Sequence, residues 1–347
     1  MCSKVLKLAV AGLAAMGSLA MAADESDSAR GAVKVVADPL ISVQGSSGNG
    51  LLPGYVSRDW EKPQPAVTRA VLVFHGRLRD ADVYWRSAQK ALEASGQADQ
   101  TIMIVPQFLA DPDIGAHGLP ANYLHWGLVD WEGGDAANGP ISVSSFDAID
   151  AIFAKLSDRN LFPNLKTVVV AGHSGGAQIV QRYAVVGKGE GPLTKAGIHV
   201  RYVVANPSSY LYFSAERPVA PVGACPKVDS WKYGWADAPA YARDKAPQAY
   251  EATYVQRDVI YLLGTNDTNP NHPALDKSCA AEAQGPYRFA RGTAYFSYLM
   301  KRHPGMTAQR LVTVDGVGHD GDAMFTSGCG LSALFDSDTC PAAKSRN

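Results

Sequence analysis

The sequence predicts an α/β fold, with a mostly parallel sheet and helices on both of its faces. Continuous runs of Val, Ile and Leu recur along the chain, and stretches with apolar residues at helical spacing separate them. The 347 residues are 46% hydrophobic and 19% charged, which is the balance of a globular protein.

Strands are expected where aliphatic and β-branched residues run without interruption. The clearest runs are 69–76, 101–108, 166–174, 200–207, 258–265 and 310–316, and an earlier antiparallel pair is expected at 32–44 and 54–60. Helical periodicity predicts helices over 80–95, 143–159, 174–187, 288–303 and 321–336. Because helices and strands alternate, neighbouring strands of the sheet are expected to be parallel.

The first 22 residues have the composition of a secretory signal peptide. Lys4 and Lys7 precede an apolar run of about a dozen residues, and Ala20-Met21-Ala22 resembles a cleavage site. The run is shorter than the ~20 residues that a spanning helix needs. We therefore expect cleavage after Ala22, no membrane span, and a single domain over 23–347 that is secreted or periplasmic.

Cleavage would remove two lysines and no acids, which leaves a formal charge of −3. This charge disfavours nucleic acid as a partner. The sequence leaves the oligomeric state open.

Four cysteines follow the predicted signal peptide: Cys225, Cys279, Cys329 and Cys340. In an oxidising compartment an even number of cysteines indicates disulfides. Of the three possible pairings we favour Cys225 with Cys279 and Cys329 with Cys340, because the second pair is close in sequence. Their spacing matches no zinc template, so no metal site is expected.

Two connections, 108–142 and 207–257, are too long to be simple turns and are rich in Gly, Pro and aromatic residues. Loops at the carboxyl ends of parallel strands surround the ligand site in such folds. Two interpretations stay open: the aromatic residues line a substrate pocket, or they pack the loops themselves. The candidates for the pocket are Trp126, Trp131, Ser208 and Tyr210, and Trp231 and Trp235 lie in the same connections.

The motif Gly172-His173-Ser174-Gly175-Gly176 lies between a predicted strand and a predicted helix. A serine at the apex of such a turn needs glycines beside it, because a Cβ there would clash. The turn exposes the Ser174 hydroxyl, and the N-terminus of the following helix favours an anion. Since a serine is a poor nucleophile without a base, the motif predicts a histidine partner.

His319 has the best context among the eight histidines, because it follows the last predicted strand in a Gly-rich loop. The imidazole needs a carboxylate to orient it, and Asp267 lies just past the penultimate strand. Asp315 and Asp320 flank His319 and are expected to be surface acids. The backbone N–H groups of Gly175 and Arg77 are the expected donors to a tetrahedral oxyanion.

These motifs resemble the α/β-hydrolase family: His75-Gly76, the serine motif, Asp267 and His319 occur in the family's order over roughly residues 65–335. The resemblance implies an eight-stranded sheet, a Ser174/His319/Asp267 triad and oxyanion donors at Arg77 and Gly175. "VFHG" with "AGHSGGAQ" is similar to secreted esterases and depolymerases of the feruloyl-esterase and polyester-depolymerase kind. The bulky residue Arg77, rather than a further glycine, follows His75-Gly76, and this disfavours a wide oxyanion loop.

The expected activity is hydrolysis of a small or polymeric carboxylic ester through an acyl-enzyme, without cofactor or metal. Activity is expected to rise through about pH 6–7, since the base must be neutral. Three alternatives stay open: a serine peptidase or amidase, an acyltransferase on the same core, and a binding protein that keeps the fold without catalysis.

Overall fold

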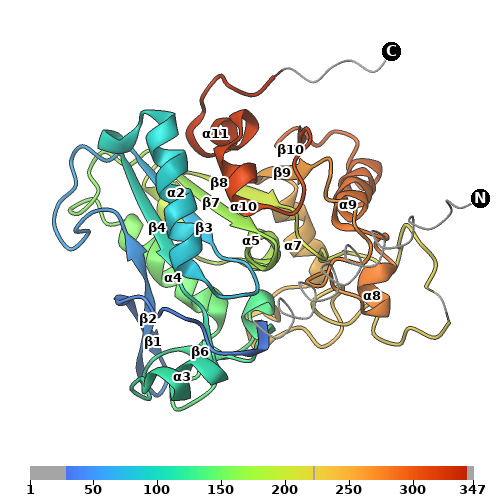
Figure 1. Cartoon of the computed structure of the whole chain (residues 1–347), viewed down its shortest axis with the longest axis horizontal. Helices are drawn as coiled ribbons and strands as arrows, with labels where there is room; N and C mark the ends of the chain where they lie inside the picture. The colour runs from blue at the N-terminus through green and yellow to red at the C-terminus, as the bar shows by residue number, and fades with distance from the viewer. Residues whose placement is uncertain (1–28, 222, 342–347) are drawn as a thin grey trace, which may run out of the picture.

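The computed structural model describes residues 29–221 and 223–341, so the predicted signal peptide lies outside the described residues. Eight strands form one sheet in the order β1-β2-β4-β3-β7-β8-β9-β10 (Figure 1). β2 is antiparallel to both β1 and β4, and the other neighbours are parallel. The predicted fold class, a mostly parallel eight-stranded sheet covered by helices, is confirmed.

The strands of the sheet are β1 (Pro39–Gly45), β2 (Gly48–Val56), β3 (Arg69–Phe74), β4 (Thr101–Pro106), β7 (Thr167–His173), β8 (His199–Ala205), β9 (Asp258–Gly264) and β10 (Gln309–Val314). The helices are α2 (Ala81–Ser95), α3 (Asp111–His117), α4 (Ser145–Leu156), α5 (Gly175–Val186), α6 (Glu190–Lys195), α7 (Pro247–Tyr254), α8 (Cys279–Glu282), α9 (Arg288–Arg302), α10 (Gly321–Thr326) and α11 (Gly328–Phe335). Short 3₁₀ turns cover Ala98–Gln100, Asp130–Gly133 and Ala240–Ala242.

The N-terminal strand pair differs from the prediction in its bounds. It was expected at 32–44 and 54–60, whereas β1 and β2 meet at a two-residue turn between Gly45 and Gly48. Gly48 has φ +131°, a conformation that favours glycine. The Gly-rich start of β2 lies outside both predicted strands; a Cβ at Gly50 would lie 2.3 Å from Leu124 Cδ2, so close packing favours a glycine there.

Local capping sets two helix boundaries that periodicity did not resolve. The Ser144 side chain accepts a hydrogen bond from the Phe146 N–H, and Asp147 accepts from the Ser144 N–H, so α4 begins at Ser145 rather than 143. The single helix expected over 321–336 is two helices. Ser327 is extended and caps α11 by accepting from the Gly330 N–H, which separates α10 from α11.

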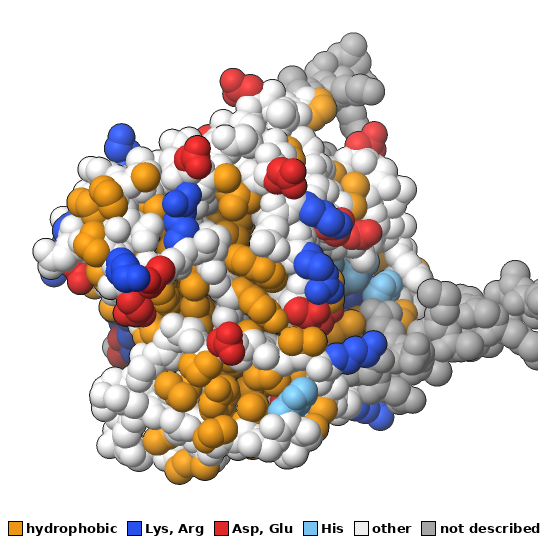
Figure 2. All heavy atoms as spheres, turned by 60° about the vertical axis from the view of Figure 1, so that its left-hand side comes forward, with side chains coloured by type: hydrophobic (Ala, Val, Ile, Leu, Met, Phe, Trp, Pro, Cys, Tyr) orange, Lys and Arg blue, Asp and Glu red, His pale blue; other side chains and the backbone are white. Residues whose placement is uncertain are grey.

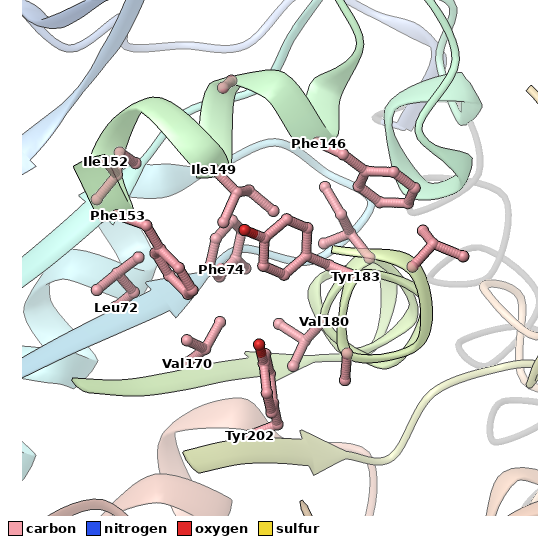
Figure 3. Close-up of a cluster of buried hydrophobic side chains, with 14 of the residues drawn as sticks. Leu72, Phe74, Phe146, Ile149, Ile152, Phe153, Val170, Val180, Tyr183 and Tyr202 are labelled. Carbon is pink, nitrogen blue, oxygen red and sulfur yellow. The ribbon is translucent and has the colours of Figure 1, made fainter. Parts of the chain in front are cut away.

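The two faces of the sheet are covered by different kinds of core. One face packs against α4, α5, α7 and α9 through large side chains, including many aromatic rings. Figure 3 shows part of it, where Phe146 and Phe153 of α4 and Tyr183 of α5 meet Phe74 and Tyr202 of the sheet. The other face packs against α2, α10 and α11 mainly through Val, Ala, Leu and Met.

The two long connections are partly ordered into short elements. The first holds β5 (Leu109–Ala110), β6 (His125–Trp126) and α3, and the second holds α7. Two cysteine pairs lie at disulfide distance, Cys225 with Cys279 and Cys329 with Cys340. These are the pairings that the sequence favoured, and the first fastens the second connection to α8.

The surface of the described chain shows no concentration of one charge on the face in Figure 2, where basic and acidic side chains are interspersed. No helix in the described ranges combines the length and apolar character needed to cross a bilayer.

Candidate active site

Ser174 occupies the sharp turn between β7 and α5. Its backbone has φ 56° and ψ −117°, a conformation that residues other than glycine rarely adopt. A Cβ at Gly172 would lie 2.2 Å from the Gly176 carbonyl oxygen, and one at Gly176 would lie 2.2 Å from the Phe74 carbonyl oxygen. Both glycines are therefore required by the turn, for the steric reason that the sequence suggested.

Three of the predicted residues meet at this turn. His319 Nε2 lies 3.0 Å from Ser174 Oγ, and His319 Nδ1 lies 2.7 Å from Asp267 Oδ2. His319 comes from the loop after β10, and Asp267 comes from the loop after β9. A Cβ at Gly264 would lie 2.4 Å from the Val317 carbonyl oxygen, so this glycine lets the two loops cross closely.

Burial is the main influence on the charge of this pair. It lowers the pKa of His319 well below 6.5, and the charge of Arg288 works in the same direction. It raises the pKa of Asp267, while the Arg288 charge opposes that rise. The imidazole of His319 is therefore neutral at neutral pH, with Nε2 directed at the serine hydroxyl.

Several residues that sequence analysis did not identify support His319 and Asp267. Fully buried Arg288 places Nη1 3.6 Å from Asp267 Oδ1. The rings of His173 and His272 pack against His319 with centroids 4.5 and 4.9 Å away. The spacing of Arg288 and His272 in the sequence did not indicate these contacts, because the two residues reach Asp267 and His319 only where loops cross in the folded chain. His173, adjacent to the predicted serine, was assigned only to the turn.

Asn206 lies at the end of β8. Its side chain accepts a hydrogen bond from the Gly264 N–H at 2.9 Å and donates to the Gly318 carbonyl oxygen at 3.3 Å. It therefore connects the loop that carries Asp267 to the loop that carries His319.

The backbone nitrogen of Arg77 lies beside Gly175, since a Cβ at Gly175 would come within 3.0 Å of it. The Arg77 guanidinium turns toward buried Glu132, with Nε–Oε1 3.0 Å and Nη2–Oε2 3.2 Å. Lys232 Nζ bonds the same carboxylate at 2.7 Å. Burial alone would raise the pKa of Glu132, but the two cations outweigh it and lower that pKa to about 2. Glu132 and Lys232 thus fasten the Arg77 loop from the two long connections.

A cavity of about 670 Å³ opens at Ser174. One wall comes from α2 and the start of α10. The other walls come from the Arg77 loop, from Leu128 and Val129 of the first long connection, and from Pro273 and Ala274. The described residues of the second long connection, 207–221 and 223–257, are not among those that line this cavity. Its volume is in the range of sites that bind small organic ligands.

The four pocket candidates from the sequence do not line the cavity. Trp126 and Trp131 are fully buried; Trp131 stacks on Phe108 at 5.5 Å, and its indole N–H donates to the Leu128 carbonyl oxygen. Tyr210 is also fully buried and stacks on Tyr295. The aromatic residues pack the connections, because rings this large fill the space beside the sheet.

Ser208 is buried as well and contacts the site only indirectly. Its hydroxyl accepts from Arg288 Nε at 3.1 Å and donates to the Ala274 carbonyl oxygen at 3.4 Å. It therefore supports one cavity wall from behind. Among residues 29–221 and 223–341, no group of three or more His, Cys, Asp and Glu side chains is arranged to hold a metal ion.

Comparison with known proteins identifies the fold. No protein-family model matches the sequence, and no curated protein matches it significantly. The chain is similar in structure to LpqC, a poly(3-hydroxybutyrate) depolymerase from Bordetella parapertussis, with TM-score 0.61 and 20% identity over 93% of this chain and 96% of that one. It is also similar to poly(aspartic acid) hydrolase-1 from Sphingomonas sp. KT-1, with TM-score 0.55 and 22% identity over 82% and 98%. The chain has the fold of the α/β hydrolases, and the resemblance found in the sequence is confirmed at that level.

Proposed function

We propose that the chain is a serine hydrolase of carboxylic esters, with Ser174 as nucleophile, His319 as general base and Asp267 as the residue that orients His319. The observation that carries the proposal is the pair of hydrogen bonds, 3.0 and 2.7 Å long, that joins these three side chains beside a cavity. A serine hydroxyl becomes nucleophilic when an oriented imidazole can take its proton.

In the proposed mechanism, His319 Nε2 takes the hydroxyl proton as Ser174 Oγ attacks the ester carbonyl carbon. The carbonyl oxygen becomes an oxyanion that accepts hydrogen bonds from the backbone N–H groups of Gly175 and Arg77. The tetrahedral intermediate then expels the alcohol, which receives the proton from His319. Water, which His319 deprotonates, attacks the carbonyl carbon of the acyl-enzyme. The second tetrahedral intermediate expels Ser174 Oγ, which takes the proton back from His319, and the acid is released.

The electrostatics of the site support these roles. Because burial lowers the pKa of His319, its base form predominates at neutral pH. Glu132 is held ionised by Arg77 and Lys232, so the loop that supplies one oxyanion donor is fixed by buried ion pairs before substrate binds. Donors fixed in advance need no reorganisation during the reaction.

We also propose that the protein is exported. Two cysteine pairs at disulfide distance support this, since such bonds persist in oxidising compartments. The signal peptide itself stays a prediction from the sequence.

Hydrolysis of p-nitrophenyl acetate, butyrate and octanoate and of methyl ferulate tests the function. We expect turnover of at least one ester by the mature protein and a loss on the order of 10⁴-fold or more in Ser174→Ala. Ser297→Ala, on the exposed face of α9, is the matched control and should retain wild-type rates.

Undiminished turnover in Ser174→Ala would contradict the proposal. Faster cleavage of a p-nitroanilide than of the matching p-nitrophenyl ester would indicate an amidase rather than an esterase.

A further inference from the structure

One stripe of α2 brings three polar side chains into the catalytic cavity. Asp80 precedes the first turn of α2, and Tyr84 and Ser87 follow at intervals of four and three residues, which places all three on one helix face. All three line the cavity that opens at Ser174. From Asp80 to Ser87 the helix rises about 10 Å. We call these three residues the α2 stripe.

Two atoms of the α2 stripe have no hydrogen-bond partner among the described residues. Ser87 is 4% exposed and its Oγ is unpaired. Asp80 Oδ1 is also buried without a partner, and the Asp80 side chain makes no capping bond to α2. Buried polar groups are nearly always hydrogen-bonded, and an unpaired one is destabilising. Two such atoms in one cavity therefore point to a ligand that bonds them.

Tyr84 adds a third polar atom. The tautomer of His173 decides whether the Tyr84 hydroxyl can donate a hydrogen bond to a ligand in the cavity. The Tyr84 hydroxyl oxygen lies 3.0 Å from His173 Nδ1, while His173 Nε2 is buried and unpaired. An unpaired buried N–H is rarer than an unpaired acceptor. We therefore assign the proton to Nδ1, which donates to Tyr84.

This assignment leaves the Tyr84 proton available to the cavity. The hydroxyl lies close to the oxyanion loop, since a Cβ at Gly76 would be 2.9 Å from Tyr84 Oη and 3.8 Å from Ser174 Cβ. The α2 stripe thus offers a donor at Tyr84, near the serine, and acceptors before and after it along the stripe, at Asp80 and Ser87.

The charges around the α2 stripe favour an uncharged ligand group. Arg86 pairs with Asp82 at 2.9 Å, and Lys90 pairs with Asp322 at 3.0 Å, so these cations do not neutralise Asp80. Basic and acidic side chains nearly balance along the cavity, which is lined by Arg30, Arg77, Arg86 and Lys90 and by Asp80, Asp320 and Asp322. A hydroxyl group, which both donates and accepts, matches this mixed set.

We propose that the α2 stripe binds hydroxyl groups of the substrate at separate points along its length, so that the preferred esters carry a hydroxyl on the acid or the alcohol part near the scissile bond. This inference rests on the proposed function and names its substrate class. A site built to bond a hydroxyl discriminates strongly against the analogue that lacks it, because its polar groups are then left unpaired.

Matched esters test the inference. The acid part is probed with p-nitrophenyl 3-hydroxybutyrate against p-nitrophenyl butyrate, and the alcohol part with 1-butyrylglycerol against propyl butyrate. For at least one pair we expect kcat/KM of the wild-type protein to be about 10-fold or more higher with the hydroxylated ester. Ser87→Ala, Tyr84→Phe and Asp80→Ala remove separate points of contact, and at least one of them should reduce that ratio by about fivefold or more.

Glu93→Gln, at an exposed position of α2 outside the cavity lining, is the control and should keep the wild-type ratio. Ser87→Ala should melt at the same or a higher temperature, because it removes an unpaired buried hydroxyl and adds a better helix former. A lost preference in a fully folded Ser87→Ala therefore supports binding rather than a structural role.

Ser174-dependent turnover with a ratio below about twofold for both pairs would overturn the inference and leave the esterase standing. Preference ratios that Ser87→Ala, Tyr84→Phe and Asp80→Ala leave unchanged would also overturn it. No Ser174-dependent turnover of any of the four esters would overturn the proposed function and this inference with it.

Discussion

The two sides of the central sheet differ in how they use their side chains. On the side of α4, α5, α7 and α9, tryptophan, tyrosine and phenylalanine rings pack tightly, and Trp126 and Tyr210 are fully buried. On the side of α2, α10 and α11 the core side chains are mostly small, and the cavity at Ser174 is lined by polar residues of α2 and α10. The aromatic side is filled, whereas the α2 side borders the cavity.

This difference distinguishes residues that pack the protein from residues that bind a ligand, which sequence composition alone does not. Aromatic richness in the long connections marks packing, while the polar residues Asp80, Tyr84 and Ser87 line the cavity where a ligand is expected. Substitutions on the filled side should therefore change stability, and substitutions along the cavity should change rate or substrate preference.

The largest effect expected is on the rate, from Asp267→Asn, which removes the carboxylate that bonds His319 Nδ1. Without the carboxylate the imidazole loses its orienting partner, and kcat should fall by about 10⁴-fold. Asp315→Asn is the matched control, since Asp315 is an exposed acid four residues before His319. Rates measured with p-nitrophenyl butyrate should separate the two variants, and a comparable loss in both would break the assignment of Asp267.

A pair of substitutions compares the two sides directly. Trp126→Ala on the filled side should lower the free energy of unfolding by about 3–5 kcal/mol, because it empties a fully buried volume. Val83→Ala, at a 44% exposed position that lines the cavity, should change that free energy by less than about 1 kcal/mol.

The substrate preferences of this pair should show the opposite pattern. The ratio of kcat/KM for octanoate and butyrate esters should shift in Val83→Ala and stay within about twofold in Trp126→Ala. Denaturant titration and ester kinetics on both variants check this. A shifted ratio in stable, folded Trp126→Ala would show that the filled side also reaches the substrate.

The smallest expected effect concerns pH and corrects the expectation drawn from the sequence. Activity was expected to rise through about pH 6–7, but burial lowers the pKa of His319 well below 6.5. Since protonated His319 cannot act as base, kcat/KM should fall only at lower pH. At pH 6.0 it should remain within about twofold of its pH 8 value, whereas an ordinary pKa of 6.5 would give about a fourfold loss. A pH-stat assay distinguishes the two.

Stability must be followed over the same range as a control. The pKa of fully buried His75 is lowered to about 4 by burial. A group with a lowered native pKa binds more protons when unfolded, so its contribution is complete above pH 6.5 and is lost as the pH falls toward 4. The loss from His75 alone is about 3 kcal/mol. A loss of activity caused by unfolding below pH 5 should therefore be distinguished from a loss caused by protonation of His319.

Much of the fold could be predicted from the sequence, because continuous aliphatic runs at 101–108 and 166–174 have few alternatives to buried parallel strands. The expected bounds failed where glycine or serine acted through packing or capping, as at Gly50 and Ser327. The proximity of Ser174, His319 and Asp267 could also be anticipated, since each follows a strand end and parallel strands end at one edge. Their catalytic roles stay predictions.

The surroundings of that site could not be anticipated, because they depend on contacts between segments remote in sequence. Glu132 reaches Arg77 from 55 residues away, and Arg288 reaches Ser208 from 80 residues away. The pocket candidates Trp126 and Trp131 were misplaced for a related reason: composition does not indicate on which side of a loop a ring will pack. Leu128 and Val129, between them, line the cavity instead.

Trapping of the acyl-enzyme tests the central claim most directly. The mature protein is mixed with excess p-nitrophenyl butyrate, quenched in acid within the first turnover, and digested for mass spectrometry. The account predicts a butyryl group on the peptide that contains Ser174, absent from Ser174→Ala and formed together with a stoichiometric burst of p-nitrophenol. Ester turnover with the butyryl group on another residue, or turnover that persists in Ser174→Ala, would contradict it.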